Sequence, residues 1–267
     1  MTGQENPVLR KATIRLLVIP FTVYMAWMLE TFLLEGSTNL FMRFDPAGIF
    51  IYTVIACIIT GILLPLLCIK KAFITGAVNM FQIGFRSLRR TVLAGVLTCI
   101  IGYGAVIIFS PFGTDRLKFA NAFVLLLPGA IASVMICFVL IGTHIQAFVR
   151  SGGALLSLSL GILVTAILFG ITTFAYFPAL MVKDIVFVSV GVGVIAGIFF
   201  FAIRDVYATT IVIGGCSVFI YADKLNPQYL HNAVPGVWIS AGLAACSLIG
   251  IHLYLSRNFT TIRIPDR

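Results

Sequence analysis

The chain has 267 residues, of which 60% are hydrophobic and 10% charged, and its mean hydropathy is +1.11. Soluble domains are about half apolar and about a quarter charged, so this composition excludes a soluble enzyme and a disordered chain. It is typical of an integral membrane protein with little mass outside the bilayer. The sequence therefore predicts an all-α bundle of transmembrane helices that forms a single domain over residues 1–267.

Eight apolar runs are long enough to cross the membrane, because a helix rises about 1.5 Å per residue and needs about 20 apolar residues. The fourth run is long enough to tilt, and Pro128 within it is a candidate kink. The first run ends without a small-residue cleavage site, so we expect it to be retained as an anchor. The eight runs are Thr13–Glu30, Ala47–Ile69, Thr91–Ser110, Phe123–Phe148, Ala154–Tyr176, Ile185–Ile203, Val206–Ala222 and Gly236–Leu255.

The basic residues predict the orientation of these spans. If the N-terminus is cytoplasmic and eight spans alternate, 13 of the 18 Lys and Arg residues lie in inside segments and 5 in outside loops. This asymmetry follows the positive-inside rule, so we expect both termini in the cytoplasm. We expect the protein in the plasma membrane. The net charge of +9 is then a matter of topology. We expect membrane lipids as partners, other membrane proteins as candidate partners, and no nucleic acid.

The longest inside segment, residues 70–90, predicts an interfacial amphipathic helix. Its apolar stretch, Ala72–Phe85, is too short to cross the membrane and has basic residues on both sides. Cations at such a position are held near anionic lipid headgroups. A partner helix is an alternative occupant of the same face. The predicted headgroup contacts are Lys70, Lys71, Arg86, Arg89 and Arg90.

Ionisable side chains within the apolar runs are candidate functional groups, because they are costly at membrane depth. Glu30 ends the first run and Glu35 follows five residues later, which is not a same-face spacing on an α-helix. We expect both carboxylates to be solvated near the outer interface, with Arg43 as a candidate ion-pair partner. His144 and His252 could form a shared metal or proton site if their helices touch. The alternative is that each histidine forms hydrogen bonds to the backbone or to lipid headgroups.

Metal and nucleophile chemistry find little support in the sequence. The six cysteines lie in apolar runs without a Cys-x-x-Cys pair, and no Glu, Asp or Cys is spaced to complete a metal site with a histidine. No complete catalytic signature is present either, so we predict no cofactor and no catalytic residue. Small residues at Gly193 and Gly197, and at Ser157 and Gly161, predict close helix packing within the chain rather than dimerisation.

Several glycine and phenylalanine positions of the second half follow a known order of motifs. Phe169-Gly-Ile-Thr-Thr173 is similar to a Phe-Gly-x-x-His motif, and Gly193–Gly197 is similar to a Gly-rich helix that follows it. Arg204–Gly215 is similar to the stretch that leads into a final His-x-x-x-Asn motif. Over about Leu125–Ile220 the chain thus resembles the CAAX-protease and bacteriocin-processing (CPBP, or Abi) family of intramembrane enzymes. This resemblance implies an eight-helix bundle.

The catalytic positions of that family are missing. Apolar residues replace its paired glutamates, Ile141 replaces its arginine, and Thr173 and Gly214 or Gly215 replace its histidines. General acid–base catalysis needs a titratable group within hydrogen-bond reach, so the chain is not expected to hydrolyse peptides by that route. The resemblance therefore implies a degenerate, non-catalytic relative.

Two functions are compatible with these observations, and a third is disfavoured. The first is a non-catalytic membrane protein, a CPBP-like pseudoenzyme that binds transmembrane helices or lipid or serves as a subunit of a membrane complex. The alternative is a transporter or permease component for an apolar or lipid-like substrate, with candidate helix breaks at Pro65 with Gly61, at Pro128-Gly129 and at Gly214-Gly215. An enzyme acting on lipid or prenyl groups would need Asp-rich or His-rich loops, which the sequence lacks.

Overall fold

The computed structural model describes residues 7–74, 82–113, 115–149, 152–178, 183–225, 227–232 and 234–259. Within these residues the chain is helical and forms no strand. Eight helices are long and apolar enough to cross a membrane, which confirms the all-α multi-pass architecture and the number of spans. These spans are Leu17–Arg43, Pro46–Lys70, Leu88–Phe109, Arg116–Phe148, Ala154–Tyr176, Ile185–Ile203, Val206–Lys224 and Pro235–Arg257.

Three of the spans contain π-helical segments, in which the backbone hydrogen bond joins residues five apart instead of four. The helices in chain order are α1 (Pro7–Thr31), π-helix η1 (Phe32–Gly36), α2 (Leu40–Arg43), α3 (Pro46–Tyr52), π-helix η2 (Thr53–Leu63), α4 (Leu64–Ile74), α5 (Leu88–Phe109), α6 (Arg116–Ser133), π-helix η3 (Val134–Gly142), α7 (Thr143–Phe148), α8 (Ala154–Tyr176), α9 (Lys183–Ile203), α10 (Val206–Tyr221), the 3₁₀-helix η6 (Ala222–Lys224), α11 (Pro227–Leu230) and α12 (Pro235–Phe259).

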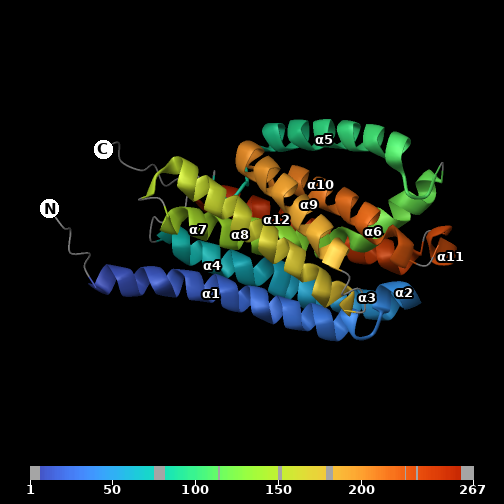
Figure 1. The fold of residues 1–267 in the computed structure, drawn as a ribbon, viewed down its shortest axis with the longest axis horizontal. Coiled ribbons are helices and arrows are strands. Elements are labelled where there is room, and N and C mark those ends of the chain that lie inside the picture. Colours follow the sequence, from blue (N-terminus) through green and yellow to red (C-terminus); the bar gives the residue numbers. More distant parts are fainter. Residues whose placement is uncertain are drawn as a thin grey trace.

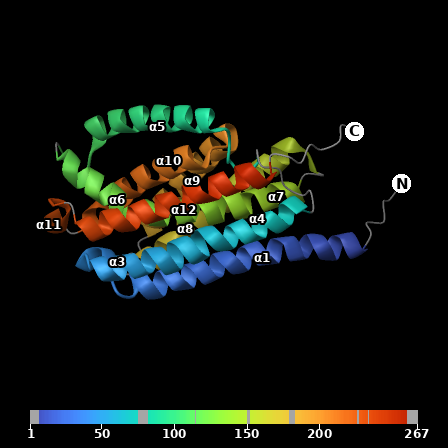
Figure 2. The same ribbon diagram turned by 180° about the vertical axis from the view of Figure 1, so that it is seen from behind.

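The spans lie roughly side by side along one axis (Figures 1 and 2). We call the end at which α1 begins and α12 ends the terminal end, and the opposite end, which holds α2, α3 and α11, the distal end (Figure 1). An even number of spans brings the chain back to the terminal end, as the predicted topology requires. That the terminal end faces the cytoplasm stays a prediction.

The span formed by α6, η3 and α7 is the centre of the bundle. In its most apolar stretch 94% of the residues are buried, and Val134 to Ile141 have no exposed surface. It packs against α1, η2, α8, α10 and α12. Because lipid is as apolar as these side chains, such packing is stabilised by dispersion and close contact rather than by the hydrophobic effect.

Helix α5 stands apart from the other spans. It packs mainly on α10, and none of the residues in its most apolar stretch is buried (Figure 1). A Cβ added at Gly95 would meet only the side chain of Ile211, at 4.0 Å, and a Cβ added at Gly102 would meet no atom within 4 Å. A lone helix is compatible with a bilayer, since its backbone groups are bonded internally and its apolar side chains can face lipid.

Small residues bring α8 and α9 into close contact. A Cβ on Gly193 would lie 2.8 Å from the Cα of Ala166, and a Cβ on Gly170 would lie 2.2 Å from a methyl group of Val190. A Cβ on Gly197 would lie 3.3 Å from a methyl group of Ile162 in α8. The predicted role of Gly193 and Gly197, packing within the chain, is confirmed, and Gly170 is a further close contact that was not predicted from the sequence.

We expect Gly193→Ala to destabilise the protein by about 1–3 kcal/mol, because the added methyl group overlaps the backbone of Ala166. Gly191→Ala is the matched control, since nothing lies within 4 Å of a Cβ at that position of the same helix. Removing a helical glycine there should leave stability unchanged or raise it by up to about 1 kcal/mol. Thermal unfolding of both variants in one detergent measures the difference. Equal stability of the two variants would show that α8 and α9 are not packed this closely.

Candidate functional site

The π-helical turn η1 contains Glu35, the second carboxyl group of the first span. The Ser37 amide donates to the Phe32 carbonyl at 2.7 Å, a bond that spans five residues. The adjacent Gly36 lets the backbone pass close to α8, because a Cβ there would lie 2.1 Å from the Ala175 carbonyl oxygen. The span therefore continues past Glu30 to Arg43, and the expected end of the first span at Glu30 is wrong.

Glu35 is buried inside the bundle. Its exposed fraction is 0%, and neither carboxyl oxygen has a hydrogen-bond partner. The Phe41 amide approaches the carboxyl group without reaching hydrogen-bond geometry. The expectation that Glu35 is solvated at an interface is therefore wrong. Arg43 is exposed, and none of the ion pairs between described residues joins the two.

Four further buried polar atoms, all on the first two spans, lack partners. Together with its two oxygens they are the only such side-chain atoms found among the described residues, and all come from residues 27–35 and from position 53. Two of the four atoms are the hydroxyl groups of Thr31 and Thr53, which lack the bond that other helical threonines make. Thr98 and Thr165, for example, donate to the carbonyl four residues earlier. Buried polar groups are nearly always satisfied by protein, water or a ligand. The four atoms are Trp27 Nε1, Glu30 Oε2, Thr31 Oγ1 and Thr53 Oγ1.

Aromatic side chains surround this position. Tyr176 at the end of α8 lies within electrostatic reach of Glu35, and its hydroxyl accepts a hydrogen bond from the Tyr52 hydroxyl at 3.1 Å. Phe41 stacks against the Tyr176 ring at 6.3 Å between centroids, and Trp27 meets the same ring edge-on at 6.3 Å. We call these groups, with Tyr221, the carboxyl–aromatic site.

A polar chain leads away from the site across the bundle. Tyr221 at the end of α10 lies within electrostatic reach of Glu35 and donates to the Thr173 hydroxyl at 3.4 Å. Thr173 in turn donates to the Ser189 hydroxyl at 2.9 Å, so four spans share one line of polar groups.

A small cavity of about 20 Å³ adjoins Tyr176 and Tyr221. This is enough for about one water molecule, and hydroxyl groups in its wall supply the partners that a buried water needs. Gly129 keeps the space next to the Tyr176 hydroxyl open, because a Cβ there would lie 2.5 Å from that oxygen. The lining residues are Phe41, Leu126, Gly129, Ala130, Ser133, Phe169, Thr172, Tyr176, Ser217 and Tyr221.

The two intramembrane histidines do not form a common site. His144 Nδ1 lies 2.6 Å from the Leu140 carbonyl, which accepts only, so this nitrogen carries the proton. His252 Nε2 donates to the Arg86 carbonyl at 2.8 Å, and its Nδ1 accepts from the Tyr207 hydroxyl at 3.1 Å. No group of three metal-binding side chains occurs among the described residues. The expected hydrogen bonds to backbone are confirmed for both histidines.

The basic segment 70–90 reaches the bundle at both ends. Lys70 Nζ donates to the Tyr254 hydroxyl at 3.4 Å, and Arg86 Nε donates to the Arg204 carbonyl at 3.1 Å. Phe85 is 3% exposed and packs against His252, so this part of the segment faces the protein rather than lipid. Arg89 and Arg90 are exposed at the start of α5. Residues 75–81 and the Lys71 side chain lie outside the described residues, so the interfacial helix stays a prediction.

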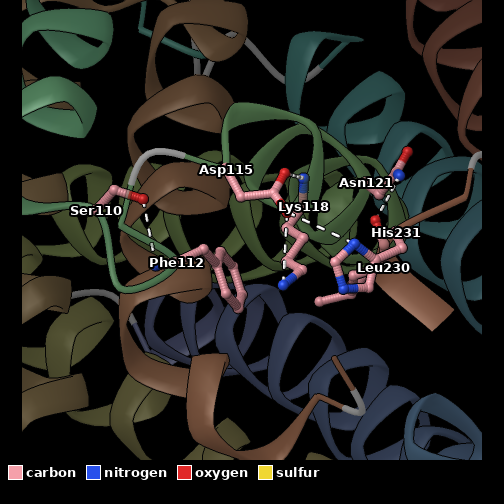
Figure 3. A network of polar contacts seen from close by, with 7 residues as sticks. All are labelled: Ser110, Phe112, Asp115, Lys118, Asn121, Leu230 and His231. Carbon is pink, nitrogen blue, oxygen red and sulfur yellow. Dashed lines mark hydrogen bonds and ion pairs between the residues drawn. The ribbon is translucent and has the colours of Figure 1, made fainter. Parts of the chain in front are cut away.

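A polar cluster at the distal end joins the α5–α6 connection to the segment after α11 (Figure 3). The Asp115 carboxylate accepts from the Lys118 amide at 3.1 Å, which caps α6, and lies 3.4 Å from Lys118 Nζ and 3.6 Å from His231 Nδ1. Asn121 donates to the Leu230 carbonyl at 2.8 Å. The Lys118 amide bond, followed by the Lys118 and His231 side chains, lowers the pKa of Asp115.

Comparison of the chain with protein-family models, with curated proteins and with solved structures gave no match. The fold and its eight apolar spans nevertheless define the class: the chain is an α-helical multi-pass membrane protein.

We expect Asp115→Ala to lower the thermal stability of the protein at neutral pH. Because the folded state holds this carboxylate at a lowered pKa, the stabilisation is present above the ordinary aspartate pKa and is lost as the pH falls through the lowered value. The difference in Tm between wild type and variant should therefore disappear on acidification. Asp223→Ala is the control, since it removes an exposed carboxylate for which the structure shows no capping bond. A difference that persists in acid would show that the Asp115 charge is not what stabilises this end.

Proposed function

We propose that this membrane protein is a transporter for small lipophilic cations, in which the Glu35 carboxyl group binds the cation and a proton in turn. The observation that carries the proposal is that Glu35 is fully buried with both oxygens unpartnered. An ionised carboxylate without a partner in an apolar interior costs several kcal/mol, so this group requires a proton or a counter-cation. Intramembrane carboxyl groups of this kind commonly mark substrate or proton pathways.

The rings beside Glu35 support an organic cation rather than a metal ion. Tyr176 lies within electrostatic reach of the carboxyl group and Trp27 packs edge-on against the Tyr176 ring, and aromatic surface attracts cations by about 0.5–2 kcal/mol. The described residues contain no cluster of three metal-binding side chains. A substrate must pass between apolar side chains to reach the buried carboxyl group, and a lipophilic cation can do so more easily than a hydrated metal ion.

The irregular helices around the site support transport rather than permanent binding. The cavity has room for about one water, so a substrate requires the bundle to open. Thr31 and Thr53 lie where η1 and η2 begin, and discontinuous helices are where transporters place their binding groups. Transport was the alternative that the sequence left open, with an apolar substrate; the buried carboxyl group favours a cationic one.

A transport assay with purified protein in liposomes tests this proposal. We expect an imposed pH gradient to drive flux of tetraphenylphosphonium or ethidium, and Glu35→Gln to reduce that flux at least about tenfold, because the amide cannot exchange a proton for a cation. The substitution preserves the size of the side chain, so the Tm of the variant should stay close to that of wild type.

Asp45→Asn provides the control for the change of charge. Asp45 is an exposed carboxylate in the connection between the first two spans, and Asn retains its capping bond to the Ala47 amide. This variant should transport like wild type. Wild-type flux that is independent of the pH gradient, or Glu35→Gln flux equal to wild type, would mean that the carboxyl group is structural.

A non-catalytic, CPBP-like protein that binds transmembrane helices or lipid, or serves as a subunit of a membrane complex, is the second candidate. The exposure of α5 supports it, because a span that packs mainly on one neighbour leaves a long apolar surface for lipid or a partner helix. Purification in mild detergent distinguishes the two functions. A stable stoichiometric protein partner would favour this candidate, and its absence together with gradient-driven flux would favour transport. The plasma membrane remains the proposed location.

A further inference from the structure

The turn between α9 and α10 at the terminal end places Arg204 in an unusual conformation. Its φ angle is +55°, in the left-handed region that residues other than glycine rarely adopt. Such a conformation persists only where the surroundings fix it. Here the Arg204 amide donates to the Phe200 carbonyl at 2.6 Å, and Asp205 caps α10 by accepting from the Ala208 amide at 2.9 Å.

The backbone around Gly84 packs against this turn and brings Arg86 beside Arg204. The Val206 amide donates to the Gly84 carbonyl at 3.1 Å, and Arg86 Nε donates to the Arg204 carbonyl at 3.1 Å. Gly84 permits the approach, because it has a φ of +84° and a Cβ there would lie 2.9 Å from the Phe200 ring. His252 fixes the same segment by donating to the Arg86 carbonyl.

The Arg204 guanidinium has only neutral partners among the described residues. It donates to the Gln82 carbonyl at 2.8 Å and to the Gln146 side-chain oxygen at 2.6 Å, and it lies over the Phe201 ring at 4.8 Å. Burial, together with the nearby charge of Arg86, lowers the pKa of Arg204 to about 10, so it is still charged at neutral pH.

No carboxylate of the described residues lies within 4 Å of either guanidinium. Asp205 is next to Arg204 in the chain, yet its oxygens accept from the Thr91 hydroxyl at 2.8 Å and from the Ala208 amide. Hydrogen bonds between the two backbone segments thus hold two arginines of like charge beside each other. An arrangement of this kind is favourable when an anion shares the two charges, and guanidinium groups match phosphate oxygens in geometry.

We propose that Arg86 and Arg204 form a binding site for one phosphate group, belonging to an anionic lipid headgroup or to free phosphate. The site lies at membrane-surface depth, because Arg204 separates two spans that end at Ile203 and begin at Val206, and Arg86 precedes the span that begins at Leu88. It is a defined two-arginine site, distinct from diffuse attraction of surface cations to the membrane, and it does not depend on the transport proposal. Gln146 and Gln82 hold the Arg204 side chain in place for the ligand.

Ligand-dependent thermal stability of the purified full-length protein tests the site. We expect dioctanoyl phosphatidylglycerol to raise the Tm of wild type in a saturable way, and dioctanoyl phosphatidylcholine to have a much smaller effect. Arg204→Gln should weaken the phosphatidylglycerol response about tenfold or more in concentration, since it removes hydrogen bonds to a charged group. Arg89→Gln is the matched control, because it removes an exposed arginine at the same end and should keep the wild-type response.

Inorganic phosphate identifies the source of the ligand. Stabilisation by inorganic phosphate, lost in Arg204→Gln, would assign the site to free phosphate; stabilisation by the lipid alone would assign it to a headgroup. If Arg204→Gln does not fold, Arg86→Gln gives the same comparison, because its backbone bond to His252 is retained. Equal responses of the Arg204 and Arg89 variants, equal effects of the two lipids, or no wild-type response to either phosphate source would overturn the proposal.

Discussion

Polar groups inside this bundle have no bulk water to bond with, and this constraint decides how its buried threonine, histidine and glutamate side chains are arranged. Helical threonines satisfy it by donating to the carbonyl one turn back, and the histidines by bonding to backbone carbonyls. Glu35 and its neighbours do not satisfy it within the protein. Because an unsatisfied carboxyl group at this depth is costly, its presence is best explained by a proton or ligand that completes the site.

The π-helical segments provide the local structure for this exception. An α-helical spacing would separate Glu30 and Glu35 by well over one turn and turn them to different faces. In the structure Glu30 lies near the end of α1 and Glu35 lies within the π-helical turn η1, and both carboxyl groups have buried oxygens. The same change of register occurs where Thr53 begins η2, opposite the first span. The site is thus assembled at the two points where neighbouring spans depart from α-helical geometry.

The sequence was sufficient to predict the number of spans, but not the end of the first span or the carboxyl–aromatic site. Span length and hydropathy depend on single segments, so eight crossings and the close packing at Gly193 could be read from composition and spacing. Glu35 is buried within a π-helical turn, and no residue pattern in the first span predicts such a turn. Likewise, Arg204 was counted only as one of the 13 inside charges, because its approach to Arg86 is created by a contact between residues more than one hundred positions apart.

Isotope-edited infrared difference spectroscopy of purified protein measures the state of Glu35 most directly. With no cation present at neutral pH, we expect the carbonyl band of a protonated carboxylic acid that is absent from Glu35→Gln. Addition of tetraphenylphosphonium should remove that band and release a proton to the medium. A carboxylate band from Glu35 without any bound cation, or a protonated band that is unchanged at saturating cation, would contradict the claim that proton and cation alternate at this site.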